Sequence, residues 1–329
     1  MLPSWSVVAT VDEPAALVVA FVLHHLEIGA ASVDLFLDGP NPEAQAALGG
    51  FAEVRVTLCD DAFWTASTRK KKPKLHTGRQ ITNANLAYGR APGRWLLHCD
   101  CDEFVRDGQE LVAELASTAP RHQYLRLAMA ERVETGPETD GLFAGVFRTP
   151  FDNFAEVGPQ IYGDLARFLK DGVTGHKAGK ALVRTGLDLK MGIHSPEGPP
   201  PHRTANGVRL LHFDGLTRLH YMIKLLRRAH EPQVKAPPRH GLPRTAQFEQ
   251  VRGLIGQPED AANLVRQLKE LTAGQLAELR ALGALDERPF QPLGANPLAE
   301  FLTVAALDRS LRARYRDFLA GHAPGLLNP

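Results

Sequence analysis

The stretch WLLHCDCDEFV, residues 95–105, holds a histidine, two cysteines, two aspartates and a glutamate. Side chains of these types bind metal ions or move protons. In an extended chain, side chains alternate between two faces, so His98, Asp100 and Asp102 would share one side and Cys99 and Cys101 the other. A Cys-X-Cys pair is a poor zinc site, because zinc sites usually take four ligands at wider spacing. We therefore interpret both cysteines as small apolar residues that face the core.

The two aspartates are the stronger candidates for chemistry. Carboxylates that project the same way both ionise only when a cation or strong hydrogen-bond donors compensate their charge. Carboxylate oxygens suit hard cations, and Mg²⁺ typically takes one or two carboxylates together with substrate phosphates. The pair Asp100 and Asp102 therefore predicts Mn²⁺ or Mg²⁺ bound beside a phosphate-containing ligand.

The elements that would position these aspartates alternate along the chain. Apolar, β-rich runs predict four strands, at 5–11, 32–38, 53–58 and 94–100. Helical stretches separate them, at 14–30, 43–50 and 78–91. This alternation is typical of a parallel α/β sheet, in which ligands bind at the carboxyl ends of the strands.

Acidic residues follow all four predicted strands. They are Asp12 and Glu13, Asp38, Asp60 and Asp61, and Asp100 and Asp102. Aspartate also favours loops for conformational reasons, so a single instance would indicate little. Four in succession favour an acidic ligand site at one edge of the sheet.

The rest of the chain is less regular. We expect strands at 123–129 and 180–185, a loop at 198–207 and a helix at 216–230. The Pro-rich, basic stretch 231–244 marks a domain boundary. Beyond it, 258–285 and 297–322 show the 3.6-residue periodicity of helices. We predict a domain at 1–230 and, at 231–329, a Pro-rich linker with a helical C-terminal region.

The composition is that of a globular protein, with 44% apolar and 23% charged residues and a net charge of +1. A near-neutral chain offers no global field that would select nucleic acid or a membrane. Three cysteines do not suggest a disulfide framework. The N-terminus lacks the pattern of a signal peptide, and the most apolar run is shorter than the roughly 20 residues that span a bilayer. We expect a cytoplasmic protein without a transmembrane segment and without a nucleic-acid partner.

Residues 78–105, GRQITNANLAYGRAPGRWLLHCDCDEFV, resemble the segment around the Asp-X-Asp motif of GT-A-fold glycosyltransferases of family 2. In that family an Asn-bearing helix precedes an apolar strand that ends in Asp-X-Asp, and Asn85 stands fifteen positions before Asp100. Ala84 stands where the family usually has arginine. Residues 7–39 resemble the opening of a family 2-like subgroup, with Asp12-Glu13 in place of the usual Asn-Glu.

Two later segments extend the resemblance. GKALVRTGLDLKMGIHSP, residues 179–196, resembles the subgroup's Lys-bearing strand and its Met-Gly-X-His segment. LLHFDGLTRLHYMIKLLRR, residues 210–228, resembles its His-Tyr and Lys-bearing helix, with Phe213 in place of tyrosine. The resemblance covers about residues 5–230 and does not extend to the last hundred.

The resemblance implies a GT-A-like, Rossmann-like α/β fold whose mostly parallel sheet is flanked by helices, with a helical C-terminal extension. It also implies a set of residues that bind the nucleotide sugar. They are Thr10, Asp12, Glu13, Asp38, Asn85, Asp100 and Lys180. Asp102 would be the main metal ligand and Asp100 would face both the ribose and the metal. A third metal ligand would be His212, which we favour, or His194.

Three roles stay open. Lys180 is either a partner of the diphosphate or an ordinary surface lysine. The basic run 69–79 is either a solvated loop or a contact for the diphosphate or an anionic acceptor. An inverting enzyme needs a carboxylate that deprotonates the acceptor hydroxyl, for which Glu131 is the first candidate and Asp152 the second.

We thus predict a metal-dependent glycosyltransferase that moves a sugar from a nucleotide-diphosphate donor to a hydroxyl of a glycan, lipid-linked or protein acceptor. The family resemblance implies the inverting type. One alternative is a non-catalytic nucleotide-sugar-binding or scaffold protein. Another is a metal-dependent phosphohydrolase or nucleotidyltransferase that uses the same carboxylates. The C-terminal helices could bind acceptor, cover the site or form a homo-oligomer.

Overall fold

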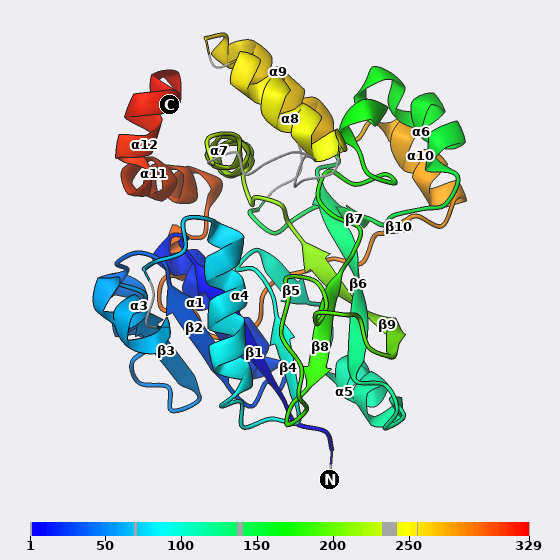
Figure 1. Cartoon of the computed structure of the whole chain (residues 1–329). Helices are drawn as coiled ribbons and strands as arrows, with labels where there is room; N and C mark the ends of the chain where they lie inside the picture. Colours follow the sequence, from blue (N-terminus) through cyan, green and yellow to red (C-terminus); the bar gives the residue numbers. More distant parts are fainter. Residues whose placement is uncertain (1, 69–70, 137–140, 232–241, 255, 329) are drawn as a thin grey trace. The chain divides into compact units, whose positions relative to one another are not determined.

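The computed structural model describes residues 2–68, 71–136, 141–231, 242–254 and 256–328 (Figure 1). These residues form two compact units, each assembled from three stretches of the chain. Unit 1 comprises Met1–Met129, Ala178–Leu210 and Pro292–Glu300. Unit 2 comprises Ala130–Lys177, Leu211–Gln291 and Phe301–Pro329. The boundary expected near residue 230 stays a prediction, and most of the Pro-rich stretch that suggested it lies outside the described residues.

Unit 1 holds the strands and helices of the N-terminal half. Its strands are β1 (Trp5–Val11), β2 (Val33–Leu37), β3 (Val54–Leu58), β4 (Trp95–His98), β5 (Glu103–Val105), the first part of β6 (Tyr124–Val133), β8 (Lys180–Arg184) and most of β9 (His202–His212). Its helices are α1 (Ala15–Glu27), α2 (Pro42–Leu48), α3 (Asp61–Thr68), α4 (His76–Tyr88) and α5 (Gly108–Ser117).

The sheet of unit 1 is parallel at its centre. β1 pairs in parallel with β2 on one side and β4 on the other, and β3 pairs in parallel with β2. β8 then pairs antiparallel with β4, and β6 antiparallel with β8. The predicted α/β class with a mostly parallel sheet is therefore confirmed. The difference from the sequence prediction is the antiparallel direction of β8 and β6, which hydropathy alone does not reveal.

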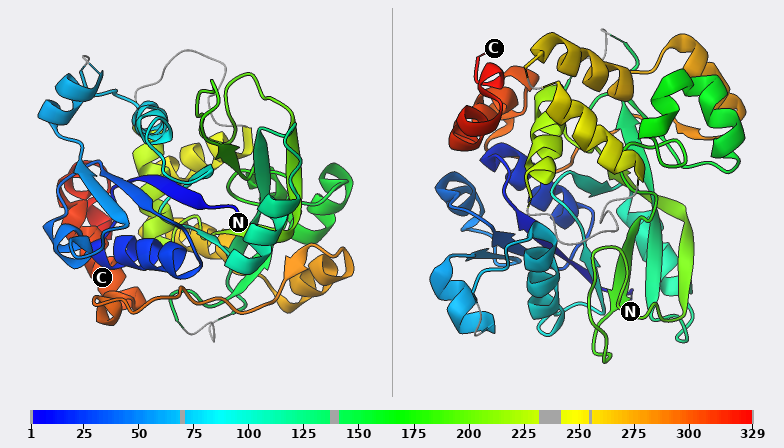
Figure 2. Two further views of the ribbon diagram at one scale, coloured as in Figure 1. Left: turned by 90° about the horizontal axis from the view of Figure 1, so that it is seen from below. Right: turned by 45° about the horizontal axis from the view of Figure 1, so that its top comes forward.

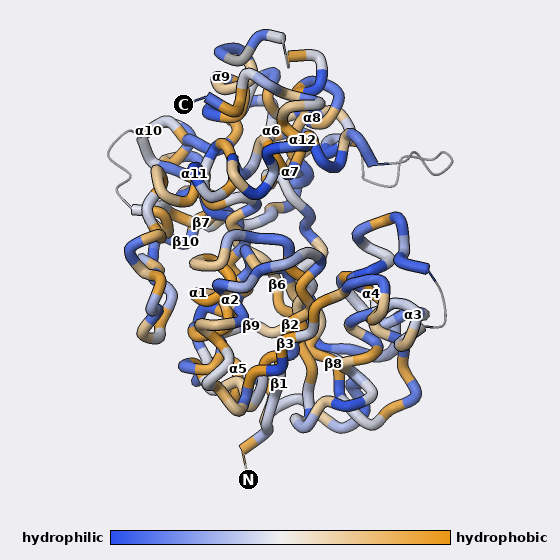
Figure 3. The backbone as a smooth tube through the Cα atoms, turned by 90° about the vertical axis from the view of Figure 1, so that its left-hand side faces the viewer, coloured by the Kyte–Doolittle hydropathy of each residue, from blue (hydrophilic) through white to orange (hydrophobic). Residues whose placement is uncertain are grey.

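Every residue of β1 is buried, which indicates that helices cover both faces of this sheet. Trp5 packs edge-on against His25 of α1, whereas Val8 belongs to a cluster with Ala84 of α4. Side chains of a strand alternate between faces, so α1 and α4 lie on opposite sides of β1. Figure 3 accordingly colours much of the strand backbone of unit 1 as hydrophobic.

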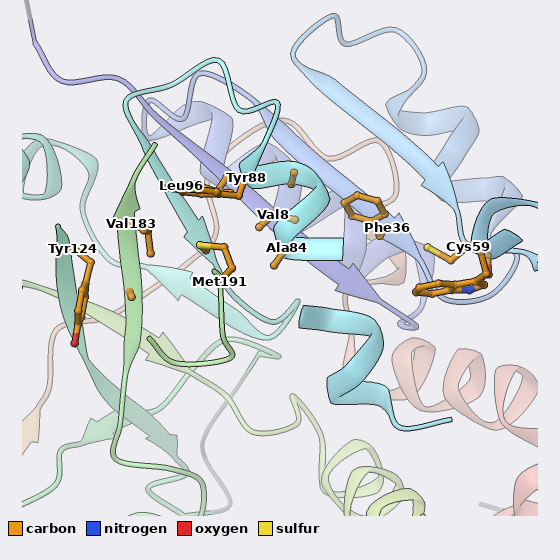
Figure 4. Packing of buried hydrophobic residues seen from close by; sticks show 12 residues of the cluster. Val8, Phe36, Cys59, Ala84, Tyr88, Leu96, Tyr124, Val183 and Met191 are labelled. Carbon is orange, nitrogen blue, oxygen red and sulfur yellow. The ribbon is translucent and has the colours of Figure 1, made fainter. Parts of the chain in front are cut away.

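The cluster between α4 and the sheet anchors that helix. Figure 4 shows Val8, Leu96 and Val183 of three strands in one cluster with Ala84 and Tyr88 of α4. The phenol of Tyr88 donates to the backbone oxygens of Arg184 and Leu187, at 2.6 and 3.1 Å. Ala84 and Ala87 lie on the side of α4 that faces the sheet, and their small side chains let the helix approach closely. This packing fixes where the polar side of α4 lies.

Unit 2 is mostly helical. Its strands are the end of β6, the last two residues of β9, β7 (Val146–Arg148) and β10 (Leu285–Asp286). Its α-helices are α6 (Phe154–Tyr162), α7 (Arg218–Ala229), α8 (Leu242–Gly253), α9 (Pro258–Lys269), α10 (Ala273–Ala281), α11 (Val304–Arg314) and α12 (Arg316–His322). Short 3₁₀ turns are η1 (Gly163–Phe168), η2 (Ala299–Phe301, which begins in unit 1) and η3 (Pro324–Leu326).

α7 buries its apolar face and contacts α8, α9 and α11 of unit 2. α8 and α9 both contact α7, as the two views of Figure 2 show. The helical character predicted for 258–285 and 297–322 is confirmed by α9 to α12. Across the described residues, helices lack the combination of length and apolar character needed to cross a membrane.

Candidate active site

The predicted acidic edge lies at the carboxyl ends of β1, β2 and β4, which run in parallel and therefore end together. Asp12 and Glu13 follow β1 and are half-buried, and Asp38 follows β2. Asp100 lies two residues beyond the end of β4. Unit 1 thus brings together four of the residues that the resemblance assigned to the nucleotide sugar.

Helix α4 supplies polar partners to all three strand ends. The Arg79 guanidinium donates to Asp38 Oδ2 from Nε at 2.8 Å and Nη2 at 2.7 Å. The Gln80 amide donates to Asp100 Oδ1. The Asn83 amide donates to Thr10 Oγ1 at 3.0 Å within the buried part of β1. Sequence reasoning missed this function of α4, although the polar residues of one helix face were visible.

Asp38 is surrounded by basic side chains. In addition to Arg79, Lys72 Nζ lies 3.0 Å from Asp38 Oδ1, and His76 Nδ1 lies 3.6 Å from Oδ2. Burial by itself would raise the pKa of this carboxyl, but the bonds from His76 and Arg79 and the charge of Arg79 outweigh it and hold the pKa well below its usual range. Asp38 therefore stays ionised and gathers three basic side chains at the edge of the sheet. Its predicted contact with the nucleotide sugar stays a prediction.

Lys180 is enclosed between two carboxylates. Its Nζ lies 2.9 Å from Asp100 Oδ2 and 3.3 Å from Glu103 Oε2. Burial opposes the charged ammonium, but Asp100 and Glu103 outweigh that effect and raise the pKa of Lys180. The Lys180 side chain is 0% exposed, so it is not the surface lysine that the sequence left open. Its predicted contact with a diphosphate stays a prediction.

The Asp-X-Asp segment is a turn and not an extension of the strand. β4 ends at His98, and the Glu103 N–H donates to the Asp100 carbonyl oxygen at 3.0 Å. The Asp100 N–H donates in turn to Glu103 Oε2 at 2.7 Å. The expected alternation of faces therefore does not extend through Asp102. Asp100 keeps 31% of its side chain exposed, whereas Asp102 is only 2% exposed.

Buried thiols lie beside these carboxylates. Cys59, Cys99 and Cys101 are all buried and form no disulfide, as expected for small core residues. Burial, followed by the charges of Glu13 and Asp102, raises the pKa of Cys101 well above its ordinary value.

Two other predicted residues bind backbone segments. Asn85 donates to Met191 O and accepts from Met191 N, each at 2.9 Å, and so holds the segment after β8 against α4. His194 Nδ1 lies 3.1 Å from Gly179 O. His98, which the sequence analysis did not select for a role, pairs through Nδ1 with Gly192 O at 2.9 Å. Burial lowers the pKa of His98 to about 4, so it is neutral at pH 7.

The predicted metal ligands Asp100, Asp102 and His194 belong to unit 1, and His212 belongs to unit 2. Within unit 1, the two carboxylate oxygens of Asp100 accept from Gln80 and Lys180. Within the residues that the structure describes, no group of three histidine, cysteine, aspartate or glutamate side chains is arranged to hold a metal ion. The side chains present therefore do not fit a complete protein-ligated metal centre, and Mn²⁺ or Mg²⁺ stays a prediction.

Glu131 and His212 lie together in unit 2. Glu131 Oε1 accepts from Arg148 Nη2 at 2.7 Å and from Thr174 N at 2.9 Å, and Oε2 accepts from Gly175 N at 2.7 Å. A Cβ on Gly175 would meet both the His212 ring and Glu131, which shows how closely the three pack. His212 Nε2 is 4.0 Å from Asp214.

This environment disfavours Glu131 as a general base. Burial would raise its pKa, but Arg148 and Lys269 outweigh burial and lower the pKa to about 2. A base of that strength accepts a proton poorly near neutral pH. Asp152, the second candidate, is exposed in the loop between β7 and α6. The identity of a base stays a prediction.

Comparison with known proteins gives no family assignment. No protein-family model matches the sequence, and no curated protein does. Among solved structures, residues 1–349 of S. aureus TarS align over 97% of this chain and 92% of that one, with 11% identity and a TM-score of 0.36. A longer S. aureus TarS structure aligns over 75% of this chain and 42% of that one, with 10% identity and a TM-score of 0.34. A mycobacterial protein aligns over 95% and 74%, with 11% identity and a TM-score of 0.31. Scores this low carry no argument about function.

Proposed function

We propose that the chain is a glycosyltransferase that moves a sugar from a nucleotide-diphosphate donor to an acceptor hydroxyl. We propose further that the donor binds at the carboxyl ends of β1, β2 and β4. The observation that supports this most is the division of charge along one sheet edge. At the end of β2 the cations Lys72 and Arg79 outnumber the Asp38 carboxylate that they contact, whereas at the ends of β1 and β4 carboxylates outnumber the single ammonium of Lys180.

The two kinds of group match the two ends of such a donor. A partly exposed carboxylate such as Asp100 can accept hydrogen bonds from ribose or sugar hydroxyls. The basic groups of Lys72, His76 and Arg79 suit a diphosphate. When the sugar leaves, negative charge grows on the diphosphate, and fixed cations stabilise that charge in the transition state.

Orientation is the second contribution that these residues would make. α4 fixes Arg79 and Gln80 relative to each other, and its packing on the sheet fixes both relative to Asp38 and Asp100. Such positioning lowers the entropic cost of bringing donor and acceptor into line. The inverting course, the acceptor class and the use of Mn²⁺ or Mg²⁺ are parts of the proposal that come from the sequence resemblance.

The test begins with binding. Nucleoside diphosphates and nucleotide sugars are screened by thermal shift with EDTA and with Mn²⁺, since a ligand that binds the native state raises its apparent stability. We expect at least one nucleoside diphosphate to stabilise the protein. Arg79→Gln should weaken that binding about tenfold or more, the effect of losing a bond to a charged group. The matched control is Arg55→Gln, because Arg55 is an exposed arginine near the opposite end of β3.

Product analysis then separates the candidate activities. Release of a nucleoside diphosphate together with a glycosylated acceptor supports glycosyl transfer. Release of inorganic phosphate or pyrophosphate instead would indicate a phosphohydrolase or nucleotidyltransferase. Tight binding without turnover would favour a nucleotide-sugar-binding protein. Absence of binding with every nucleotide would contradict the proposal.

A further inference from the structure

We propose that the ammonium group of Lys180 is the permanent counter-cation of Asp100 and Glu103, so that Asp100 accepts a hydroxyl of the nucleotide sugar and takes no divalent metal ion. The proposal deepens the function proposed above, on which it rests for the identity of the ligand. The contacts of Lys180 are independent of that function.

Lys180 satisfies two carboxylates with one charge. Its Nζ bonds to Asp100 Oδ2 at 2.9 Å and lies 3.3 Å from Glu103 Oε2. Neither Lys180 nor Glu103 exposes its side chain to solvent. A buried carboxylate needs such a partner, because an isolated ion inside a protein is costly. The ammonium therefore occupies the position next to Asp100 that faces the interior.

Two further contacts hold Asp100 in place. Gln80 donates to Oδ1, and the Asp100 N–H is bound to Glu103. Asp100 keeps 31% of its side chain exposed, so a neutral hydroxyl can approach its oxygens from the solvent side and donate to them. A divalent cation would bind the same oxygens beside a fixed ammonium, and two cations at such short range repel strongly.

Lys180 cannot easily withdraw from this position. It begins β8 and lies opposite Leu127 of β6. Gly179, just before it, has a φ of 66°, and a Cβ there would lie 2.0 Å from the Leu127 carbonyl oxygen. The backbone that carries Lys180 is thus held tightly against β6. An ammonium that left its partners would remain buried without compensation.

The test measures Mn²⁺ binding directly, by the loss of the free Mn²⁺ signal in electron paramagnetic resonance, without nucleotide. We expect Asp100→Asn to leave the Mn²⁺ affinity of the otherwise unchanged protein within twofold. Lys180→Met should gain a Mn²⁺ site at least tenfold tighter than any in the parent, because it removes the ammonium that contacts both Asp100 and Glu103. Adding Asp100→Asn to Lys180→Met should remove the new site.

Two variants serve as controls. Lys180→Arg keeps the positive charge and should gain no Mn²⁺ site. Lys190→Met removes an exposed lysine that lies 3.8 Å from Glu197, and it should behave as the parent.

A tenfold loss of Mn²⁺ affinity in Asp100→Asn alone would overturn the proposal. Because this result compares only Asp100→Asn with the parent protein, it tests the proposal even if Lys180→Met does not fold. A folded Lys180→Met that gains no Mn²⁺ affinity would overturn it as well. Nucleotide binding by the parent protein reports separately on the proposed function, because its absence would leave the Mn²⁺ comparisons unaffected.

Discussion

The buried ion pair between Glu131 and Arg148 provides the sharpest test of the chemistry in unit 2. Glu131→Gln would leave the Arg148 guanidinium, which is 1% exposed, without its counter-charge. Burial, Arg148 and Lys269 together set the pKa of Glu131 at about 2, against an ordinary value of 4.5. At about 1.4 kcal/mol for each pKa unit, this preference for the ionised form contributes about 3 kcal/mol to stability.

An independent comparison gives a similar magnitude. Removing one member of a buried ion pair typically costs about 3–5 kcal/mol. We therefore expect Glu131→Gln to lower the free energy of unfolding by about 3–5 kcal/mol, a large part of the roughly 5–15 kcal/mol that stabilises a typical protein. Urea denaturation followed by circular dichroism measures the change. Asp152→Asn, an exposed change in the same unit, should stay within about 0.5 kcal/mol of the parent.

The contribution of Glu131 to the free energy of unfolding should depend on pH. A carboxyl whose pKa is lower in the folded state stabilises the fold above its unfolded pKa of 4.5 and loses that contribution as the pH falls towards 2. The stability difference between the parent and Glu131→Gln should therefore shrink from pH 4.5 downwards. A difference below about 1 kcal/mol at pH 7 would refute the reasoning, because it lies far under the range for a broken buried pair. A stable Glu131→Gln that had lost glycosyl transfer would instead support Glu131 as the base.

Three further changes test other parts of the chain. Burial lowers the pKa of His24 to about 4 and that of His25 to about 3, from 6.5, so both are neutral in the fold. The contribution of these neutral histidines to the free energy of unfolding should be complete above pH 6.5 and decline as the pH falls towards 4. His25→Leu should make the decline less steep, as measured by urea denaturation at several pH values. An unchanged dependence of the unfolding free energy on pH would contradict this. Gly179→Ala should lower the free energy of unfolding by about 2 kcal/mol or more, because the new Cβ would clash with Leu127. Gly186→Ala has a similar φ of 77° but no atom within 4 Å of the new Cβ, so it should cost only about 1 kcal/mol. Equal decreases of the melting temperature in the two variants would contradict the steric explanation. Asp38→Asn should remove the ion pairs that hold Lys72 and Arg79 in place. Because the two cations would then no longer be held in position, calorimetric titration should show a lower affinity for nucleoside diphosphates. An unaltered affinity would show that Asp38 does not position these cations.

The parallel strands of unit 1 could be predicted because their signals are local. β1, β2 and β3 are apolar runs bounded by helices and turn residues, and each lies within a residue or two of its expected limits. Other elements were missed. α3 lies between the strand predicted at 53–58 and the basic run 69–79, where no helix was predicted. β9 begins at His202, within a Pro- and Gly-rich stretch that predicted a loop.

The candidate site could be predicted only in part. Carboxylates at the ends of parallel strands follow from sequence order, and so does their nearness. The position of Lys180 does not, because it depends on an antiparallel pairing between β8 and β6. The exposure of Asp100 and the burial of Asp102 depend on a turn closed by the Glu103 side chain, which an extended reading of Cys-Asp-Cys-Asp cannot anticipate.

The discontinuous build of unit 1 has a consequence for how the chain is made. Near the end of the sequence, Leu293 donates its N–H to His24 Nδ1 at 3.1 Å, and the Asn296 amide donates to Ala16 O at 3.0 Å. Helix α1 therefore acquires these two partners only after some 270 intervening residues have left the ribosome. Closing so long a loop slows folding, because its entropy is lost before the contacts form. During synthesis, the unit that carries the candidate site should stay incomplete until this late segment arrives, and a nascent chain stopped before residue 292 should expose one side of α1 to chaperones.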